Sequence, residues 1–217
     1  LDTPGPGEIG IVEELLVDRA FVADANEAAM IAELAEVKPT VPHSVSNALA
    51  ASGLALTAGV THEALRAAIS TFTPGRHRIE KVYESDGVTW IDDSKATNLD
   101  AMQMAIRSQT RPLILIAGGK DKGFEFDENS DLVHDKSRAA ILIGEMRHRI
   151  AASWKQSQCH PVDTLEEAVS LASELAQPGD TVLFSPGTSS FDMFRNYGER
   201  GNIFKSLVQK LKPKNKH

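Results

Sequence analysis

The stretch Ile91-Asp92-Asp93-Ser94-Lys95-Ala96-Thr97-Asn98 lies between the apolar run at residues 88–90 and a dense apolar segment at residues 101–106. This order predicts a strand, a polar turn and the start of a helix. Such a turn directs backbone N–H groups and the helix dipole at any anion placed above it. Acidic and hydroxylated residues are also the commonest turn and cap formers, so an ordinary solvated turn explains the stretch equally well when it is taken alone.

The composition is that of a soluble globular protein, with 217 residues, 41% hydrophobic and 24% charged. A formal net charge of -7 argues against general binding to nucleic acid or to a membrane surface, so an anion site must be a local basic patch. Cys159 is the single cysteine, which excludes an internal disulfide framework and fits a cytoplasmic location. The first residues lack an initiator methionine and have the composition of a loop, so we expect the chain to be part of a longer protein.

From residue 79 onward, apolar strands alternate with helices. This pattern predicts a Rossmann-like α/β domain with a mostly parallel sheet covered on both faces. Strands are expected at 79–83, 88–91, 113–117, 139–143 and 181–184, and helices at 98–107, 129–134, 145–154, 165–176 and 193–211. The cation-rich turn at residues 73–78 marks the expected domain boundary.

The first 78 residues follow a different pattern. Residues 8–21 suit a short hairpin, and residues 27–37 have a helix-forming composition. The two prolines within residues 38–42 then interrupt any helix, because the residue before a proline is pushed out of the helical region. Helices are expected at 47–56 and 61–72.

Unusual polar residues follow three of the expected strands. Asp93, Lys95 and Thr97 follow one strand, residues 118–123 follow the next, and residues 185–190 follow the last. In an open α/β sheet, ligands bind beyond the carboxyl ends of the strands. The three turns are therefore expected to meet at one rim, where lysines, hydroxyls and exposed N–H groups suit a small molecule with more than one carboxylate or phosphate.

Each turn also has an ordinary structural explanation. Gly118-Gly119-Lys120 lacks the spacing of a P-loop, and Lys122 suits a carboxylate clamp and a plain charged turn equally well. Residues 185–190 could serve only to cap the following helix, although their hydroxyls exceed what one cap uses. Arg147-His148-Arg149 is expected to form a solvated helix face, and no His/Cys/Asp spacing indicates zinc.

Four segments carry a resemblance to a known family. Residues 76–80, 91–98, 185–194 and 195–201 closely resemble the Mur ligases of bacterial peptidoglycan synthesis, and among them those that add D-glutamate. The Asp-Ser-Lys-Ala-Thr-Asn run is the most specific match, since sister ligases resemble Asp-x-Ala-His at that place. The resemblance implies that residues 1–78 are the end of the central ATPase domain.

Residues 79–217 would then form the C-terminal, D-glutamate-binding domain. The implied reaction is ATP-dependent: the carboxylate of UDP-N-acetylmuramoyl-L-alanine becomes an acyl phosphate, the D-glutamate amine attacks it, and phosphate leaves. The P-loop and the main Mg²⁺ ligands of the family are not found in this sequence, so we expect the chain to be inactive alone. No residue is assigned a catalytic or metal-binding role.

The resemblance also implies an ATP site. Asn47 and Arg78 would face ATP from the central domain, while Asp93 would reach the nucleoside and Lys95 the phosphates.

It implies a D-glutamate site as well. Thr97 and Lys122 would hold the α-carboxylate, and Ser190 and the backbone of Tyr197 would hold the side-chain carboxylate.

The resemblance implies a cytoplasmic, monomeric enzyme of cell wall biogenesis, linked to cell division and cell shape, without nucleic-acid or membrane partners. Two alternatives stay open. One is another acid–amino-acid ligase, such as a folylpolyglutamate synthetase relative, although the Asp-Gly-Ala-His-Asn-like motif of that group is absent. The other is a non-catalytic module that binds a nucleotide or a dicarboxylate.

Overall fold

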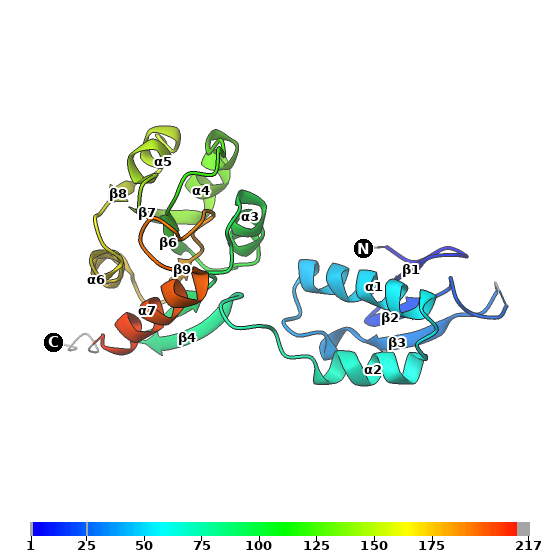
Figure 1. Cartoon of the computed structure of the whole chain (residues 1–217). Coiled ribbons are helices and arrows are strands. Elements are labelled where there is room, and N and C mark those ends of the chain that lie inside the picture. Colours follow the sequence, from blue (N-terminus) through cyan, green and yellow to red (C-terminus); the bar gives the residue numbers. More distant parts are fainter. Residues whose placement is uncertain (1, 25, 212–217) are drawn as a thin grey trace. The chain divides into compact units, whose positions relative to one another are not determined.

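The computed structural model describes residues 2–24 and 26–211. The chain divides into two compact units, Leu1–Gly75 and Arg76–His217, and each is described by itself (Figure 1). A boundary after Arg78 stays a prediction, and in the structure Arg76, His77 and Arg78 belong to the second unit. None of the helices in the described part of the chain combines the length and apolar character needed to cross a bilayer.

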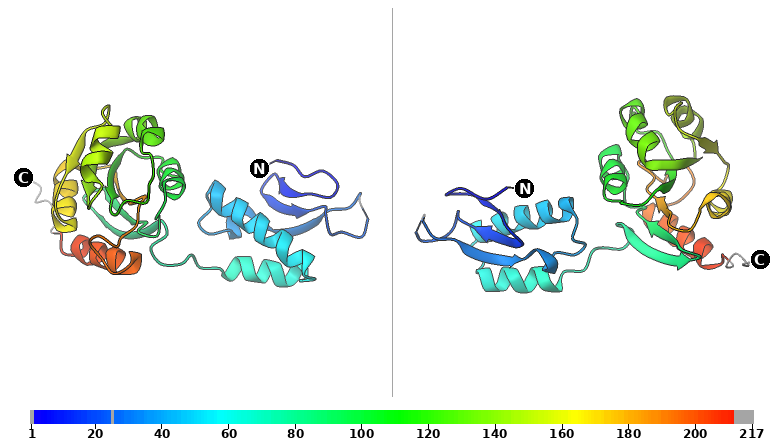
Figure 2. Two further views of the ribbon diagram at one scale, coloured as in Figure 1. Left: turned by 45° about the horizontal axis from the view of Figure 1, so that its top comes forward. Right: turned by 180° about the vertical axis from the view of Figure 1, so that it is seen from behind.

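The first unit is a small sheet with two helices (Figure 2). Strands β1 (Ile9–Val12), β2 (Leu15–Asp18) and β3 (Ala29–Glu33) pair antiparallel in that order, which confirms the predicted hairpin. Helices α1 (Pro42–Thr57) and α2 (His62–Thr71) share one apolar core with the sheet, and the predicted helices are confirmed. Thr61 caps α2 by accepting the N–H of Ala64.

The helix-forming composition of residues 27–37 is overridden. Instead of a helix, the segment forms β3 and the short 3₁₀ helix η1 (Leu34–Glu36). Ile31 and Ala32 are fully buried, because β3 lies against β2 and its side chains complete the core. Packing against a neighbouring strand outweighs a weak local helix propensity.

The second unit contains a six-stranded sheet in the order β4-β5-β9-β6-β7-β8. All neighbouring pairs are parallel except β4 and β5, which confirms the predicted α/β class. The strands are β4 (Glu80–Ser85), β5 (Val88–Asp92), β6 (Leu113–Gly118), β7 (Ser137–Ile143), β8 (Cys159–Pro161) and β9 (Thr181–Phe184). The helices are α3 (Leu99–Arg107), α4 (Ser130–Lys136), α5 (Arg147–Ser153), α6 (Leu165–Leu175) and α7 (Tyr197–Gln209), with a 3₁₀ turn η2 (Asp127–Asn129) before α4.

Both faces of this sheet are buried. Along β6, Ile114 and Ile116 pack with residues of α6 and α7, whereas Leu113 and Leu115 pack with residues of α3, α4 and α5. Figure 1 shows the helices in these two groups around the sheet. Because successive side chains of a strand point to opposite faces, an all-apolar strand such as β6 requires cover on both.

The strand order positions the three polar turns. β9 lies between β5 and β6, and the three strands run parallel. Their carboxyl ends therefore lie side by side at the centre of the sheet. The residues that follow them emerge at one rim.

Candidate functional site

The three turns that follow β5, β6 and β9 are hydrogen-bonded to one another. The N–H of Gly187 donates to the carbonyl of Ala96 at 3.0 Å, and the N–H of Gly118 donates to the carbonyl of Pro186 at 2.9 Å. Lys120 and Ser189 form an isolated antiparallel bridge, in which the Lys120 N–H donates to the Ser189 carbonyl at 2.9 Å. The convergence expected from the sequence is therefore present in the structure.

Close approach explains the glycines in the turn after β6. Gly119 has φ 144°, and a Cβ there would meet the Ser189 carbonyl at 2.3 Å. A side chain at this position would push the β6 and β9 turns apart.

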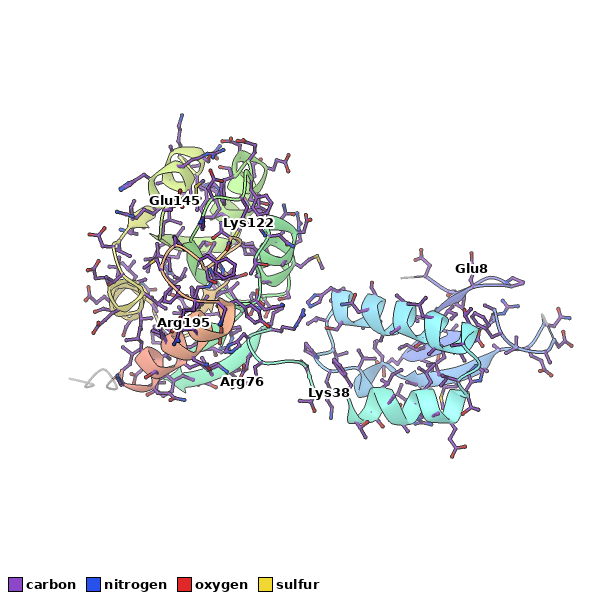
Figure 3. The ribbon with its side chains drawn as sticks, viewed as in Figure 1. Glu8, Lys38, Arg76, Lys122, Glu145 and Arg195 are labelled. Atoms are coloured by element: carbon purple, nitrogen blue, oxygen red, sulfur yellow. The ribbon has the colours of Figure 1, made fainter. Side chains whose placement is uncertain are left out.

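Thr97 and Lys122 lie together at the rim. The Lys122 ammonium donates to the backbone carbonyl of Thr97 at 3.1 Å. Lys122, which Figure 3 labels, is exposed, so its charge remains available to a ligand. If a carboxylate bound there, the Lys122 ammonium would donate to a charged acceptor in place of the Thr97 carbonyl, and that hydrogen bond would be stronger.

Ser190 and Tyr197 lie on the segment that follows β9. Ser190 is buried, and its carbonyl accepts the N–H groups of Phe194 and Met193 at 2.8 and 3.2 Å. The helix predicted from residue 193 begins only at Tyr197, because Asn196 caps α7 by accepting the N–H of Glu199 at 2.8 Å. Among the described residues, no hydrogen bond joins Ser190 directly to Thr97 or Lys122. The β9 turn joins the other two through its backbone.

Asp93 carries a buried carboxyl and directly follows the last residue of β5. Its Oδ2 accepts the Ser185 hydroxyl at 2.7 Å and its Oδ1 accepts the Ile79 N–H at 3.2 Å. Burial is the main influence and raises the pKa of Asp93 to about 7, while the two hydrogen bonds act in the opposite direction. The charge of Arg78 favours the ionised form and that of Asp92 disfavours it.

The other three residues assigned to ATP differ in their placement, and Arg78 is exposed just before β4. The backbone N–H of Lys95 donates to the carbonyl of His77 at 3.0 Å, and its ammonium lies over the ring of Tyr197. Asn47 is exposed on α1, in the first unit.

Arg200 is a site residue that the sequence interpretation missed. Its side chain, on α7, is fully buried, and its guanidinium donates to the Ser94 hydroxyl, the Ser94 carbonyl and the Thr188 carbonyl at 3.0, 2.9 and 3.2 Å. Burial lowers the pKa of Arg200 to about 10, and three nearby aspartates partly oppose that effect. One signal was available: Arg200 falls on the same helical stripe as Tyr197 and Phe204, where an apolar residue would be expected.

Arg149 corrects the expectation of a purely solvated face on α5. Its guanidinium donates to the Asp121 and Glu125 carboxylates at 3.2 and 3.0 Å and to the Phe124 carbonyl at 3.4 Å. These contacts bracket Lys122 and Gly123 in the turn after β6. Arg149 therefore restrains the loop that presents Lys122.

One cluster has atoms close enough to hold a metal ion among the described residues. It consists of His77, Glu80 and Asp92, whose candidate ligand atoms lie within 4.8 Å of one another. His77 Nδ1 lies 2.6 Å from Asp92, and the Lys205 ammonium lies 2.6 Å from Glu80. A cation already neutralises these carboxylates, and Mg²⁺ prefers an all-oxygen shell. The cluster is an ion-pair network that does not fit magnesium.

Comparison with known proteins identifies a matching family and similar chains. Residues 77–187 match the protein family described as "Mur ligase, glutamate ligase domain". The chain is 44% identical over 221 aligned residues to a "UDP-N-acetylmuramoylalanine--D-glutamate ligase" of Streptomyces coelicolor, covering 97% of this chain and 47% of the relative. It is 42% identical to the ligase of the same name from Thermobifida fusca, with the same coverage. The chain thus spans about half the length of the curated relatives it matches.

Solved structures show the same fold at low sequence identity. MurF from Acinetobacter baumannii superposes with a TM-score of 0.65 at 16% identity, covering 94% of this chain and 44% of that chain. A murein peptide ligase Mpl from Psychrobacter arcticus gives a TM-score of 0.64 at 14% identity, with the same coverage.

Proposed function

We propose, from the premise that this chain belongs to the Mur ligase family, that its rim binds D-glutamate for ATP-dependent amide-bond formation in peptidoglycan synthesis. The observation that carries the proposal is the meeting of three turns at one sheet edge, with Lys122 against Thr97. Two relatives that align with 97% of this chain are named as D-glutamate ligases.

The two carboxylates of D-glutamate are assigned to different parts of the rim. The α-carboxylate would bind the Lys122 ammonium and Thr97, where a charge-assisted bond replaces the present contact to a carbonyl. The side-chain carboxylate would bind Ser190 and the backbone N–H of Tyr197 at the start of α7, where the helix dipole favours an anion. Two separated anion sites select a dicarboxylate over a monocarboxylate.

The nucleotide is assigned to the turn after β5, which belongs to the same rim. Asp93, in its ionised form, would accept hydroxyl groups of the nucleoside, and Lys95 would offset phosphate charge. Arg78, which is exposed and whose charge acts on Asp93, would also contact ATP. The assignment of Asn47, on the first unit, to ATP stays a prediction. Mg²⁺ would offset phosphate charge in this reaction, but the described residues hold no set that fits it.

The reaction proposed is the transfer of the ATP γ-phosphoryl group to the carboxylate of UDP-N-acetylmuramoyl-L-alanine. The amine of D-glutamate then attacks the acyl carbon, the C–N bond forms and inorganic phosphate leaves. The rim would serve to hold the amino acid and to offset charge. The enzyme would act as a monomer in the cytoplasm, with effects on cell shape and division.

Nuclear magnetic resonance of the 217-residue chain tests the binding step. We expect D-glutamate to shift the amide signals of residues 94–97, 120–123 and 188–190 together, and L-glutamate to shift them much less. Equal shifts with both enantiomers, or shifts elsewhere, would reject the proposed site. ATP-dependent phosphate release by this chain alone, in the presence of D-glutamate and UDP-N-acetylmuramoyl-L-alanine, would contradict the expectation that it is inactive alone.

A further inference from the structure

The side chain of Tyr197 lies directly beside the ammonium of Lys95. The Lys95 Nζ is 4.0 Å from the centroid of the Tyr197 ring. A cation within about 6 Å of an aromatic face is attracted by the negative face of the ring. From the sequence, Tyr197 was assigned a role through its backbone alone, so the ring has no function in the site as described.

The ring is held in place through the backbone of its own residue. Tyr197 is the first residue of α7, and its carbonyl accepts the Ser94 hydroxyl at 2.9 Å. The same hydroxyl accepts the Nε of Arg200 at 3.0 Å. The start of α7 and the Ser94-Lys95 turn are therefore fixed to each other by buried groups.

A second restraint comes from His77. Its ring meets the Tyr197 ring edge to face, at 6.3 Å between centroids and 80° between planes. His77 in turn contacts Asp92 Oδ2 at 2.6 Å, and Asp92 Oδ1 accepts the Ser94 N–H at 2.9 Å. Edge-to-face contact suits the quadrupoles of the two rings, so His77 fixes the tilt of the Tyr197 face.

The lysine is anchored to the same residues as the ring. The Lys95 N–H donates to the His77 carbonyl at 3.0 Å, so the backbone of the lysine and the residue that orients its aromatic partner are joined. By contrast, the exposed Lys122 lies 5.3 Å from the ring of Phe124, two residues along its own loop. Lys122 and Phe124 thus form a looser lysine–aromatic pair for comparison with Lys95 and Tyr197.

We infer that the ring of Tyr197 is a positioning platform that holds the Lys95 ammonium ready for an anionic ligand. This inference rests on the proposed function for the nature of that ligand, the phosphates of ATP. A lysine side chain loses considerable rotamer freedom when it is fixed, so a platform that restricts it before binding lowers that cost. Tyr197 acts through Lys95 and is a positioning residue.

The position of the ammonium can be measured directly by nuclear magnetic resonance. Ring currents shift nuclei above an aromatic face upfield, so the ε-methylene signals of Lys95 should be upfield of those of other lysines. Tyr197→Leu should abolish this displacement, and Tyr197→Phe, which keeps an aromatic face, should retain it. Phe124→Leu is the matched control and should leave the Lys95 signals unchanged. Lys95 signals that stay the same in Tyr197→Leu would overturn the inference.

A binding measurement separates the inference from the proposed function. Titration with ATP should displace the Lys95 ε-methylene signals, and Tyr197→Leu should weaken ATP binding roughly threefold to tenfold, the range expected for one cation–π contact. Phe124→Leu, the matched control, should leave ATP binding unchanged. If Tyr197→Leu removes the upfield displacement and ATP still leaves Lys95 unaffected, the platform stands and the assignment of Lys95 to ATP falls.

A merely structural effect of the substitution is distinguished by the same experiment. If Tyr197→Leu disordered α7, the amide signals of the whole helix and of Ser94 would move away from their positions in the unmodified chain. Retention of those amide signals in Tyr197→Leu, with loss of the Lys95 displacement, supports the platform. Broad loss of α7 signals in both Tyr197 variants would overturn the selective role of the ring.

Discussion

The guanidinium of Arg200 contacts both oxygens of Ser94, with Nε 3.0 Å from the hydroxyl and one Nη 2.9 Å from the carbonyl. Two further contacts of 3.2 Å reach the carbonyl of Thr188 in the β9 turn. One buried side chain from α7 therefore joins the turns after β5 and β9. The fixed fork of arginine donors suits this task, which lysine could not perform in the same way.

Replacing Arg200 should destabilise the second unit. Arg200→Met keeps much of the volume but leaves the Ser94 and Thr188 carbonyls without their buried donor. We expect a loss of about 2–4 kcal/mol in the free energy of unfolding, measured by chemical denaturation. Arg195→Met is the control, because Arg195 is exposed and pairs with Glu199 one turn away, and it should be nearly neutral. Equal losses in both variants would contradict the role of Arg200.

Asp93 should make stability depend on pH in an identifiable way. Its pKa rises from 3.8 to about 7 on folding. The contribution of Asp93 to the free energy of unfolding is therefore fully present below pH 3.8 and is lost as the pH rises through 7. The reason is that the Asp93 carboxyl ionises at a lower pH in the unfolded chain than in the folded chain. Asp93→Asn has no ionisable group at this position and should not lose stability in this way. The free energy of unfolding of Asp93→Asn, relative to that of the unmodified chain, should therefore rise by roughly 4 kcal/mol between pH 4 and 8. If the unfolding free energies of the variant and the unmodified chain differ by the same amount at every pH in that range, the buried Asp93 carboxyl is not the cause of the pH dependence.

Lys122 should control the affinity for D-glutamate. Lys122→Ala removes the charge proposed to bind the α-carboxylate, and we expect roughly a tenfold or greater loss of D-glutamate affinity by calorimetric titration. ATP affinity should change little. Lys81→Ala is a suitable control, because that exposed lysine pairs with Glu84 on β4. If ATP and D-glutamate binding fall together, Lys122 does not belong to a separate amino-acid site.

Arg149 should act on the same site through the loop. Arg149→Gln removes the contacts that flank Lys122, so amide hydrogen exchange at residues 121–125 should become faster. Arg147→Gln is the matched control, because Arg147 pairs with Asp163 and does not contact this loop in the described structure. Unchanged exchange at Gly123 in Arg149→Gln would show that the loop is held by other contacts.

The architecture around the rim was predictable because local pattern and tertiary structure agree there. The three central strands are apolar on both faces, and the residues after them are too polar for ordinary turns. Thr97 and Lys122 could be brought together from the sequence because parallel neighbours end at one edge. The roles assigned to them stay predictions.

The features missed have physical reasons. Residues 159–161 form β8 although the strand is only three residues long and ends in a proline, which gives almost no periodic signal. Arg200 is a charged residue on an apolar stripe, and only the tertiary structure reveals the carbonyls that satisfy it. The network of His77, Asp92 and Lys205 joins segments more than 100 residues apart, beyond the reach of local patterns.

The most direct test of the account is a crystal structure of the chain with D-glutamate. The account predicts the α-carboxylate within hydrogen-bonding distance of the Lys122 ammonium and Thr97, with the other carboxylate at Ser190 and the first N–H groups of α7. D-glutamate bound away from these three turns, or bound with neither carboxylate near Lys122, would contradict it.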